Sequence, residues 1–168
     1  DDSGSANEVT LGAPATGYIG WAGDVDVWKL AIDGLADGDG LDVSVGAVEK
    51  VALTVEVTDA GGRRLVRSTG APGAAVVLRS LAPRVAAGEP TVQFIAVSGK
   101  PANPDATYQL DVTSRLLELD EEAEPNDTDA RANPLRFGTE DTGTMRGELG
   151  PGETDRFVLS PSPSAGSL

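Results

Sequence analysis

Cysteine and histidine are both absent from this 168-residue sequence, and each absence excludes a class of function. Without cysteine the chain forms no disulfides, no thiolate zinc sites and no thiol nucleophile. Without histidine it lacks the usual general base, so neither Ser-His-Asp nor Cys-His catalysis can be built. The chemistry that remains belongs to carboxylates, which hold a hard cation or, as an alternative, act as a glycosidase-like acid pair.

Long hydrophobic runs are absent as well. Hydrophobic residues make up 39% of the chain, which is enough for a sandwich core, but no run approaches the ~20 apolar residues of a membrane-spanning helix. The chain opens with Asp1-Asp2-Ser3-Gly4 and shows no charged-then-apolar signal segment. We therefore expect no membrane insertion, and we expect the targeting segments of a longer precursor to lie outside this sequence.

Basic residues are scarce: 13 Lys and Arg oppose 27 Asp and Glu, and the formal net charge is −14. A surface this negative repels nucleic acid and anionic lipid and attracts cations. Nucleic acid is therefore not expected as a partner, and a metal cation is favoured. Acidic residues also keep an exported protein soluble, so the charge alone does not establish a metal site.

Alternating apolar residues predict short β-strands from residue 17 to about residue 114. Trp28, Leu30 and Ile32 show this period of two, and similar runs occupy residues 41–45, 53–57, 75–81, 91–98 and 107–113. Turns rich in Gly, Asp and Pro separate the runs. The pattern predicts an all-β fold, an antiparallel β-sandwich that is jelly-roll-like.

A strongly acidic segment, residues 118–129, follows the predicted sandwich. Seven of its twelve residues are Asp or Glu, and such a run is usually a solvated linker. Residues 116–122 are expected to form one or two helical turns at most. The predicted organisation is a sandwich over residues 1–115, an acidic linker over 116–129, and a further unit over 130–168 that ends in a low-complexity tail.

Comparison of the chain with itself indicates a repeat. Residues 6–12 align with residues 132–138 at an offset of 126, and the same offset pairs Gly17 with Gly143. After a three-residue insertion, one strand continues the alignment: Asp26, Trp28 and Leu30 pair with Asp155, Phe157 and Leu159. The second copy stops after its second or third expected strand, so residues 130–168 are interpreted as a truncated second repeat.

Short motifs recur in the same order in both copies. The second copy carries Glu124-Pro125-Asn126-Asp127-Thr128, Gly143 and Asp155-x-Phe157-x-Leu159; the first carries Gly23-Asp24-Val25-Asp26-Val27-Trp28-x-Leu30 and a closing Tyr108-Gln109-Leu110-Asp111-Val112. In this order the motifs resemble bacterial pre-peptidase C-terminal (PPC) domains. The resemblance implies a jelly-roll-like sandwich appended to secreted peptidases and other exported proteins. It also implies a relation to the collagen-binding domains of bacterial collagenases, which carry calcium near their amino-terminal linker.

The motif Glu122-x-Glu124-x-Asn126-Asp127 is the strongest candidate for a metal site. In an extended strand Glu122, Glu124 and Asn126 project to one side, and Asp127 follows at the bend. Their oxygen atoms are hard donors of the kind that calcium binds, with about six to eight oxygens around the ion. The alternative is an acidic interdomain linker with a Pro-Asn-Asp turn.

Further ligands follow from the resemblance rather than from spacing. The calcium-binding relatives imply that Asp155, together with Glu153, supplies the rest of the coordination. In the first copy Asp24 and Asp26 form the equivalent half-site, but this copy has no Glu-Pro-Asn before it. For Asp24 and Asp26 a β-turn that enters a strand is the simpler interpretation.

Aromatic residues make up only 4% of the chain, which weakens any case for carbohydrate binding. Four of them alternate with polar residues in expected strands and are predicted to pack in the core: Trp28, Phe94, Tyr108 and Phe157. Tyr18 and Trp21 flank Gly20 and are candidate ligand-binding residues that could stack on a sugar or a peptide. Packing in the core or at a sheet edge is the simpler interpretation for both.

These features predict a non-catalytic, calcium-stabilised binding or spacer module of a secreted or cell-surface bacterial protein. The expected partner is an extracellular protein or a polysaccharide polymer, and the truncated repeat also allows self-association. The alternative is a structural repeat of a cell-surface protein in which calcium only stiffens the joint. An enzyme would need two carboxylates in a cleft; Asp24 and Asp26 are candidates, but no second motif supports them.

Overall fold

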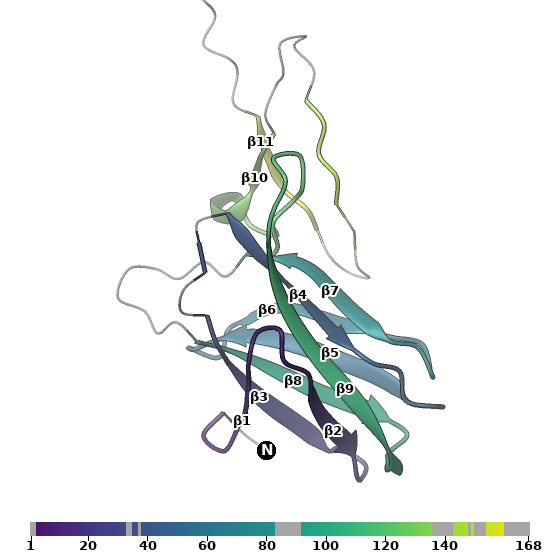
Figure 1. The fold of residues 1–168 in the computed structure, drawn as a ribbon. Helices are drawn as coiled ribbons and strands as arrows, with labels where there is room; N and C mark the ends of the chain where they lie inside the picture. Colours follow the sequence, from purple (N-terminus) through teal and green to yellow (C-terminus); the bar gives the residue numbers. More distant parts are fainter. Residues whose placement is uncertain are drawn as a thin grey trace, which may run out of the picture.

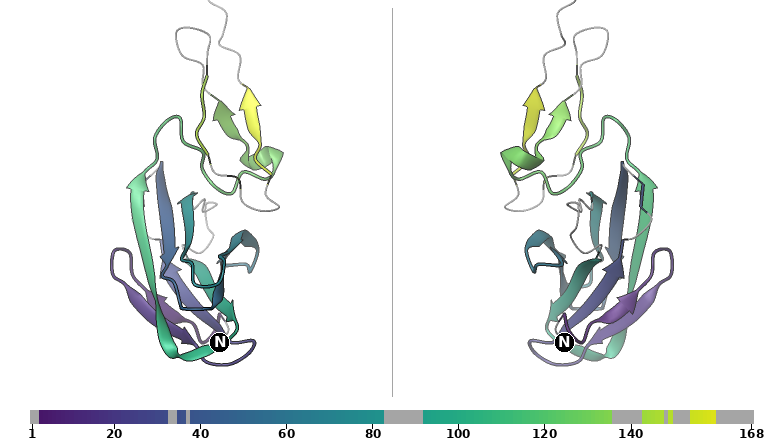
Figure 2. Two further views of the ribbon diagram at one scale, coloured as in Figure 1. Left: turned by 90° about the vertical axis from the view of Figure 1, so that its right-hand side faces the viewer. Right: turned by 90° about the vertical axis from the view of Figure 1, so that its left-hand side faces the viewer.

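The structure is a computed structural model that describes residues 3–32, 35–36, 38–82, 92–135, 143–147, 149 and 154–159. Within these residues, nine strands form two sheets packed face to face, and a small two-stranded sheet lies beyond one end of them (Figures 1 and 2). The predicted all-β, jelly-roll-like antiparallel sandwich is confirmed. The described residues include no helix that is long and apolar enough to cross a membrane.

One sheet of the sandwich has five strands in the order β1-β3-β8-β5-β6. Their bounds are β1 (Asn7–Val9), β3 (Val25–Ala31), β8 (Val92–Lys100), β5 (Ala52–Asp59) and β6 (Arg64–Thr69). Neighbouring strands are antiparallel except β1 and β3, which are parallel. The sheet therefore has β1 at one edge and β6 at the other.

The second sheet has four antiparallel strands in the order β2-β9-β4-β7. Their bounds are β2 (Ala15–Ile19), β9 (Asn103–Leu116), β4 (Asp39–Val45) and β7 (Val76–Leu81). The first residue of β9, Asn103, pairs with Ile19, and its last residue, Leu116, pairs with Asp39. Because β9 is a single strand of 14 residues, these two pairs mark opposite ends of the sandwich.

Apolar side chains that point inward from both sheets form the core. Those that are 1% exposed or less include Leu53, Val55, Val57, Ile95 and Val97 from one sheet and Leu41, Val43, Val45, Leu110 and Val112 from the other. Burying one such side chain contributes roughly 1.5–3 kcal/mol. The β-branched residues that predicted strands are thus also the ones that join the two sheets.

A chain of hydrogen bonds ties three polar groups together at one end of the core. The indole Nε1 of Trp28 donates to the hydroxyl of Tyr108 (3.0 Å), which in turn donates to Oδ2 of Asp26 (2.6 Å). Burial, followed by the hydrogen bond to Asp26, raises the pKa of Tyr108, so the phenol stays neutral and keeps its proton for donation. A Cβ at Gly17 would lie 2.3 Å from this hydroxyl, so the site requires glycine there.

Six strands predicted from the sequence are present: β3, β4, β5, β7, β8 and β9. The strands β1, β2 and β6 were not predicted. β6 has two adjacent apolar residues instead of an alternating run. β1 has three residues, of which only Val9 is buried, and β2 contains Gly17, so neither presents a run of alternating apolar residues. Residues 116–122 form no helix: Leu116 ends β9, and an isolated bridge follows at Glu121.

The predicted core packing is confirmed for Trp28 and Tyr108, which are 7% and 1% exposed, but it is wrong for Phe94. The buried side chains of β8 begin with Gln93 and Ile95, so Phe94 lies half-buried on the outer face. Apolar residues occupy both sets of alternate positions in this strand. The alternation therefore does not decide which face is buried.

The small sheet consists of β10 (Asn133–Leu135) and β11 (Phe157–Leu159), which are parallel. A 3-10 turn, η1 (Asp129–Arg131), precedes it. The core packing predicted for Phe157 is wrong, because this side chain is 44% exposed. The described part of this unit contains two strands and no facing sheet that could cover the ring.

The register of the small sheet matches that of β1 and β3. Asn133 is paired with Phe157 as Asn7 is paired with Trp28. In the same way, the last residue of β10 faces Leu159 as the last residue of β1 faces Leu30. The separations, 126 residues from Asn7 to Asn133 and 129 from Trp28 to Phe157, are the offsets at which the two parts of the sequence align.

The packing of Trp28 leads to a first prediction. Trp28→Ala should lower the free energy of unfolding by roughly 3–5 kcal/mol, since it leaves a cavity and removes the donor to Tyr108. Phe94→Ala, on the outer face of the neighbouring strand, should cost about half as much. Urea unfolding followed by circular dichroism measures both variants. Equal costs, or a Trp28→Ala variant as stable as the parent, would contradict the assigned packing.

Candidate metal centre

The acidic segment (residues 118–129) leaves the end of β9 and crosses the end of β7. Its backbone is held on both sides: the N–H of Glu124 donates to the carbonyl of Ser80 (2.8 Å), and the N–H of Glu122 donates to the carbonyl of Arg146 (2.9 Å). The segment is thus fixed between β7 and the chain around Arg146. The interpretation as a solvated linker is wrong for this part of it.

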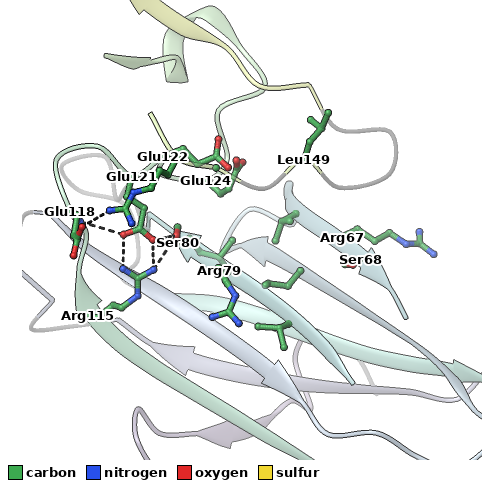
Figure 3. Close-up of a pocket in the computed structure, with 16 residues that line it drawn as sticks. Arg67, Ser68, Arg79, Ser80, Arg115, Glu118, Glu121, Glu122, Glu124 and Leu149 are labelled. Carbon is green, nitrogen blue, oxygen red and sulfur yellow. Dashed lines mark hydrogen bonds and ion pairs between the residues drawn. The ribbon is translucent and has the colours of Figure 1, made fainter. Parts of the chain in front are cut away.

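Arg115, near the end of β9, anchors the segment through Glu121. Its guanidinium donates to both carboxylate oxygens of Glu121 and, through Nε, to Oδ2 of Asp42 (3.1 Å). The hydroxyl of Ser80 donates to Glu121 as well (2.7 Å). The hydrogen bonds from Arg115 lower the pKa of Glu121 to about 2. Figure 3 shows Arg115, Glu121 and Ser80 at the junction of β9, β7 and the acidic segment.

The next acidic residues turn to the opposite side and form a cluster. Glu122, Glu124 and Asp155 each place one carboxylate oxygen within 4.8 Å of the others. Glu122 and Glu124 are 3% and 7% exposed, and Asn126, two residues on, is fully buried. Figure 3 shows the Glu122 and Glu124 carboxylates close together, away from Arg115. The alternation expected of an extended segment therefore brings Glu122, Glu124 and Asn126 to one side.

Asn126 connects the members of this cluster and leaves an oxygen for a ligand. Its backbone N–H donates to Oε2 of Glu124 (3.2 Å), and its side-chain Nδ2 donates to Oε2 of Glu122 (3.3 Å). The N–H groups of Asn126 are thus used, whereas its Oδ1 is buried without a hydrogen-bond partner in the described structure. Oδ1 of Asp155 is likewise buried and has no hydrogen-bond partner in the described structure. Buried oxygens of this kind are ordinarily satisfied by a proton donor or a metal.

Close packing at Gly147 shapes the wall of the cluster. A Cβ at this position would lie 2.0 Å from Cδ of Glu122. Any side chain at Gly147 would therefore push the Glu122 carboxylate out of its place. Gly147 lies 25 residues from Glu122 in the chain, and no pattern in the sequence pointed to it.

The charges around the cluster are distributed unevenly. Three arginines near the cluster form ion pairs with acidic residues outside it: Arg115 with Glu121, Arg146 with Glu118 and Asp120, and Arg156 with Asp129. Three carboxylates remain gathered at the cluster itself. Two like charges this close repel each other by on the order of 3 kcal/mol in a partly buried site. A bound cation would remove that cost.

A groove of about 620 Å³ runs from the protein surface to this site. It lies between β6, β7 and the acidic segment (Figure 3), and both Glu122 and Glu124 line it. Arg67 and Arg79 line the groove on the side of the β-strands. The groove gives a cation a route to the carboxylates.

One predicted ligand that the structure describes, Asp127, is not brought into the cluster. Asp127 is exposed, and its backbone carbonyl accepts a hydrogen bond from Nε of Arg156 (3.0 Å). Glu153 lies outside the described residues. The structure thus gathers Glu122, Glu124 and Asp155 with Asn126, which are four of the six oxygen donors expected in this part of the chain.

Asp24 and Asp26 lie at the other end of the sandwich, beside the end of β2. Oδ2 of Asp24, a buried residue, accepts from the backbone N–H of Gly20 (2.7 Å). Asp26 accepts from Tyr108, as described above. Both carboxylates thus have structural hydrogen bonds, and neither is near Glu122 or Glu124. The β-turn interpretation accounts for Asp24.

Tyr18 and Trp21 lie on the surface next to this turn. They are 51% and 63% exposed, so packing in the core is excluded for both. A Cβ at Gly20 would touch the ring of Tyr18 at 3.0 Å, which places that ring over the Gly20 backbone. The structure therefore leaves two aromatic side chains available for contact, at the end of the sandwich opposite the carboxylate cluster.

The fold and the site together define a class: a small β-sandwich protein with a buried cluster of oxygen donors at one end. The sequence matches no family model, and no curated protein matches it. Among solved structures, the chain is similar to the crystal structure of the pre-peptidase C-terminal domain of a collagenase from Bacillus anthracis. The sequence identity is 14% and the TM-score 0.44, and the similarity covers 65% of this chain and 95% of that one.

The Arg115–Glu121 pair predicts a pH dependence. The pKa of Glu121 is lowered in the folded state to about 2 from an ordinary value of 4.5, so its stabilisation is complete above pH 4.5 and is lost as the pH falls toward 2. Glu121→Gln should therefore cost on the order of 1–2 kcal/mol at pH 6, after allowance for the partly exposed guanidinium, and almost nothing at pH 2.

Urea unfolding at several pH values measures this difference. The matched control is Glu49→Gln, which removes an exposed carboxylate paired only with exposed Lys50. Its effect should be small at every pH. A Glu121→Gln cost that stays constant from pH 6 to pH 2 would show that the ion pair does not carry the stabilisation.

Proposed function

We propose that this chain is a non-catalytic, calcium-stabilised binding or spacer module of a secreted or cell-surface bacterial protein, associated with a peptidase. The observation that carries the proposal is the cluster of Glu122, Glu124 and Asp155 around Asn126, with buried oxygens on Asn126 and Asp155 that have no hydrogen-bond partner in the described structure. These groups would hold the ion, and the ion would fix the acidic segment against the sandwich.

Calcium fits this donor set better than other common metals. All candidate ligands are oxygens, from three carboxylates and one amide, which excludes a preference for zinc or copper. Calcium accepts irregular arrangements of about six to eight oxygens, whereas magnesium requires a near-octahedral site and retains its waters. Four protein residues with water completing the shell suit calcium.

The organisation of the chain follows the same reasoning. We propose a sandwich module over residues 1–115, a metal-binding segment over 116–129, and a second copy of the module beginning at residue 130. The common register of β1 with β3 and of β10 with β11 supports the second copy, because a three-dimensional pairing repeats at the offset of the sequence alignment. Asp155 thus occupies in the second copy the place of Asp26 in the first.

Binding of a partner is assigned to the opposite end of the first module. Tyr18 and Trp21 are exposed aromatic residues, and such residues anchor protein and sugar ligands through large contact areas. The expected partner is an extracellular protein or a polysaccharide polymer. No catalytic role is assigned, since Asp24 and Asp26 are occupied by Gly20 and Tyr108.

A purely structural function has one observation in its favour. Glu124 is a proposed metal ligand, and its backbone N–H donates to the carbonyl of Ser80 in β7. The same residue therefore links the proposed metal site to the sandwich. Calcium would then stiffen the joint between two repeats of a surface protein. Loss of partner binding on replacing Tyr18 and Trp21 by alanine, with stability unchanged, distinguishes the binding module from this alternative.

Calcium should bind the 168-residue chain and raise its melting temperature by mass action, with a smaller effect of magnesium. Glu124→Gln should lower the affinity for calcium at least about ten-fold, because it removes one negatively charged ligand from the cluster. Glu118→Gln, the matched control, makes the same charge change at a side chain that is 69% exposed, and it should leave the affinity within about two-fold.

Calorimetric titration and thermal melting measure both quantities. A chain that shows neither heat nor a shift in melting temperature at millimolar calcium does not bind the ion. Equal weakening by Glu118→Gln and Glu124→Gln would mean that calcium is attracted by the diffuse negative charge and not by this cluster.

Gly147→Ala provides a test that changes no candidate ligand. The added methyl group would occupy the position of the Glu122 carboxylate, so calcium affinity should fall about ten-fold or more. Gly12→Ala is a control for backbone effects at an exposed glycine with no neighbouring atom within 4 Å of the added methyl group. Its backbone strain should cost stability without changing calcium affinity. Unchanged affinity in Gly147→Ala would place the ion away from Glu122.

A further inference from the structure

The open edge of β11 is the feature of the second module that its proposed function leaves unexplained. Among the described residues β11 pairs with β10 alone. Phe157, Val158 and Leu159 are 44%, 46% and 63% exposed. Three consecutive exposed apolar residues at a sheet edge form a surface on which another strand can pair.

The first module shows what lies beside the equivalent strand. There β3 pairs with β1 on one side, as β11 does with β10, and with β8 on the other side in antiparallel orientation. With this neighbour and the facing sheet in place, Trp28 and Leu30 are 7% and 1% exposed. Among the described residues, neither a second neighbouring strand nor a facing sheet accompanies their counterparts Phe157 and Leu159.

Some backbone N–H and C=O groups of β11 point away from β10, toward the side on which no strand is paired among the described residues. The N–H of Asn133 in β10 donates to the carbonyl of Arg156 (2.9 Å). Since N–H and C=O groups of successive residues alternate in direction along a strand, the groups of Val158 also face β10 and those of Phe157 and Leu159 face away from it. The open edge therefore offers two sets of backbone hydrogen-bonding groups.

We propose that the edge of β11 accepts an antiparallel polypeptide strand of the β8 type, extended and with alternating apolar side chains. This inference rests on the repeated organisation proposed above. Its register follows from the first module, where Lys29 is paired with Phe94 and Trp28 with Ile95. The residue in the place of Phe94 lies opposite Val158, in a pair without mutual hydrogen bonds.

The geometry of that pair suggests a sharp experiment. In antiparallel pairs without mutual hydrogen bonds the Cα atoms are about 4.5 Å apart, which a disulfide can span. The chain has no cysteine, so Val158→Cys introduces a single thiol at an exposed position. The probe is a synthetic peptide of residues 92–100, the β8 sequence, with cysteine in place of Phe94. Control peptides carry the cysteine in place of Gln93 or of Ile95.

Disulfide exchange in a glutathione buffer measures how strongly each peptide is held beside residue 158. The peptide with Phe94→Cys should form the mixed disulfide at least about ten-fold more favourably than either control, since only its thiol lies on the same face of the sheet as that of residue 158. Equal formation by all three peptides would overturn the proposal. Preferential formation of a Val158→Cys homodimer would overturn it too, because the occupant would then be a second copy of this chain.

Hydrogen exchange provides a second test that needs no substitution. When the unmodified peptide is added to the wild-type chain, hydrogen exchange should slow at the N–H groups of Phe157 and Leu159 and stay unchanged at Val158. Slowing at none of the three, or at all equally, contradicts the register. Calcium binding is measured on the same samples, so that the two proposals are tested separately. If calcium still binds but no peptide is preferred, only the proposal of strand binding at β11 is refuted.

Discussion

The arrangement of the acidic segment against the sandwich depends on one constraint, the burial of several carboxylates in one cluster. Repulsion and desolvation both oppose the cluster of Glu122, Glu124 and Asp155, and burial of such charges requires compensation by an opposite charge. Arg115, Arg146 and Arg156 form ion pairs with acidic residues outside the cluster. In the proposed function, a divalent cation that prefers oxygen ligands would provide this compensation and would bind the buried oxygen of Asn126. The backbone of the acidic segment is hydrogen-bonded to β7 at Glu124, which is also a proposed ligand, so an ion bound there would hold the segment along β7.

The two ends of the sandwich use acidic residues in different ways. At the end beside β2, Asp24 accepts a hydrogen bond from the backbone of Gly20, and Asp26 accepts one from the hydroxyl of Tyr108. Both carboxylates thus satisfy donors of the sandwich. At the other end, Asp155, which aligns with Asp26 in the proposed repeat, lies with two buried glutamates. In the proposed repeat, the same position would thus serve the core in one copy and a candidate ion site in the other. Asp155 lies beside the Glu-x-Glu-x-Asn motif, whereas Asp26 lies beside Tyr108.

Much of the fold and part of the site could be predicted from the sequence. Alternation of apolar residues located six strands, and the spacing of Glu122, Glu124 and Asn126 placed three donors on one side of an extended segment. Phe94 was assigned to the wrong face because both faces of β8 carry apolar residues, and β1 is too short for alternation to be seen. Gly147 and Arg115 were missed for a different reason: their roles arise from contacts between distant segments, which no local period records. Asp127 adjoins the motif in sequence, yet it is exposed and lies outside the cluster.

Direct observation of the ion tests the central claim most simply. Crystals of the 168-residue chain grown with millimolar calcium can be measured for anomalous scattering from the metal. The account predicts a single strong peak with oxygens of Glu122, Glu124, Asn126 and Asp155 at about 2.3–2.6 Å. An empty cluster in such crystals, or a peak beside Asp24 and Asp26 instead, would contradict it.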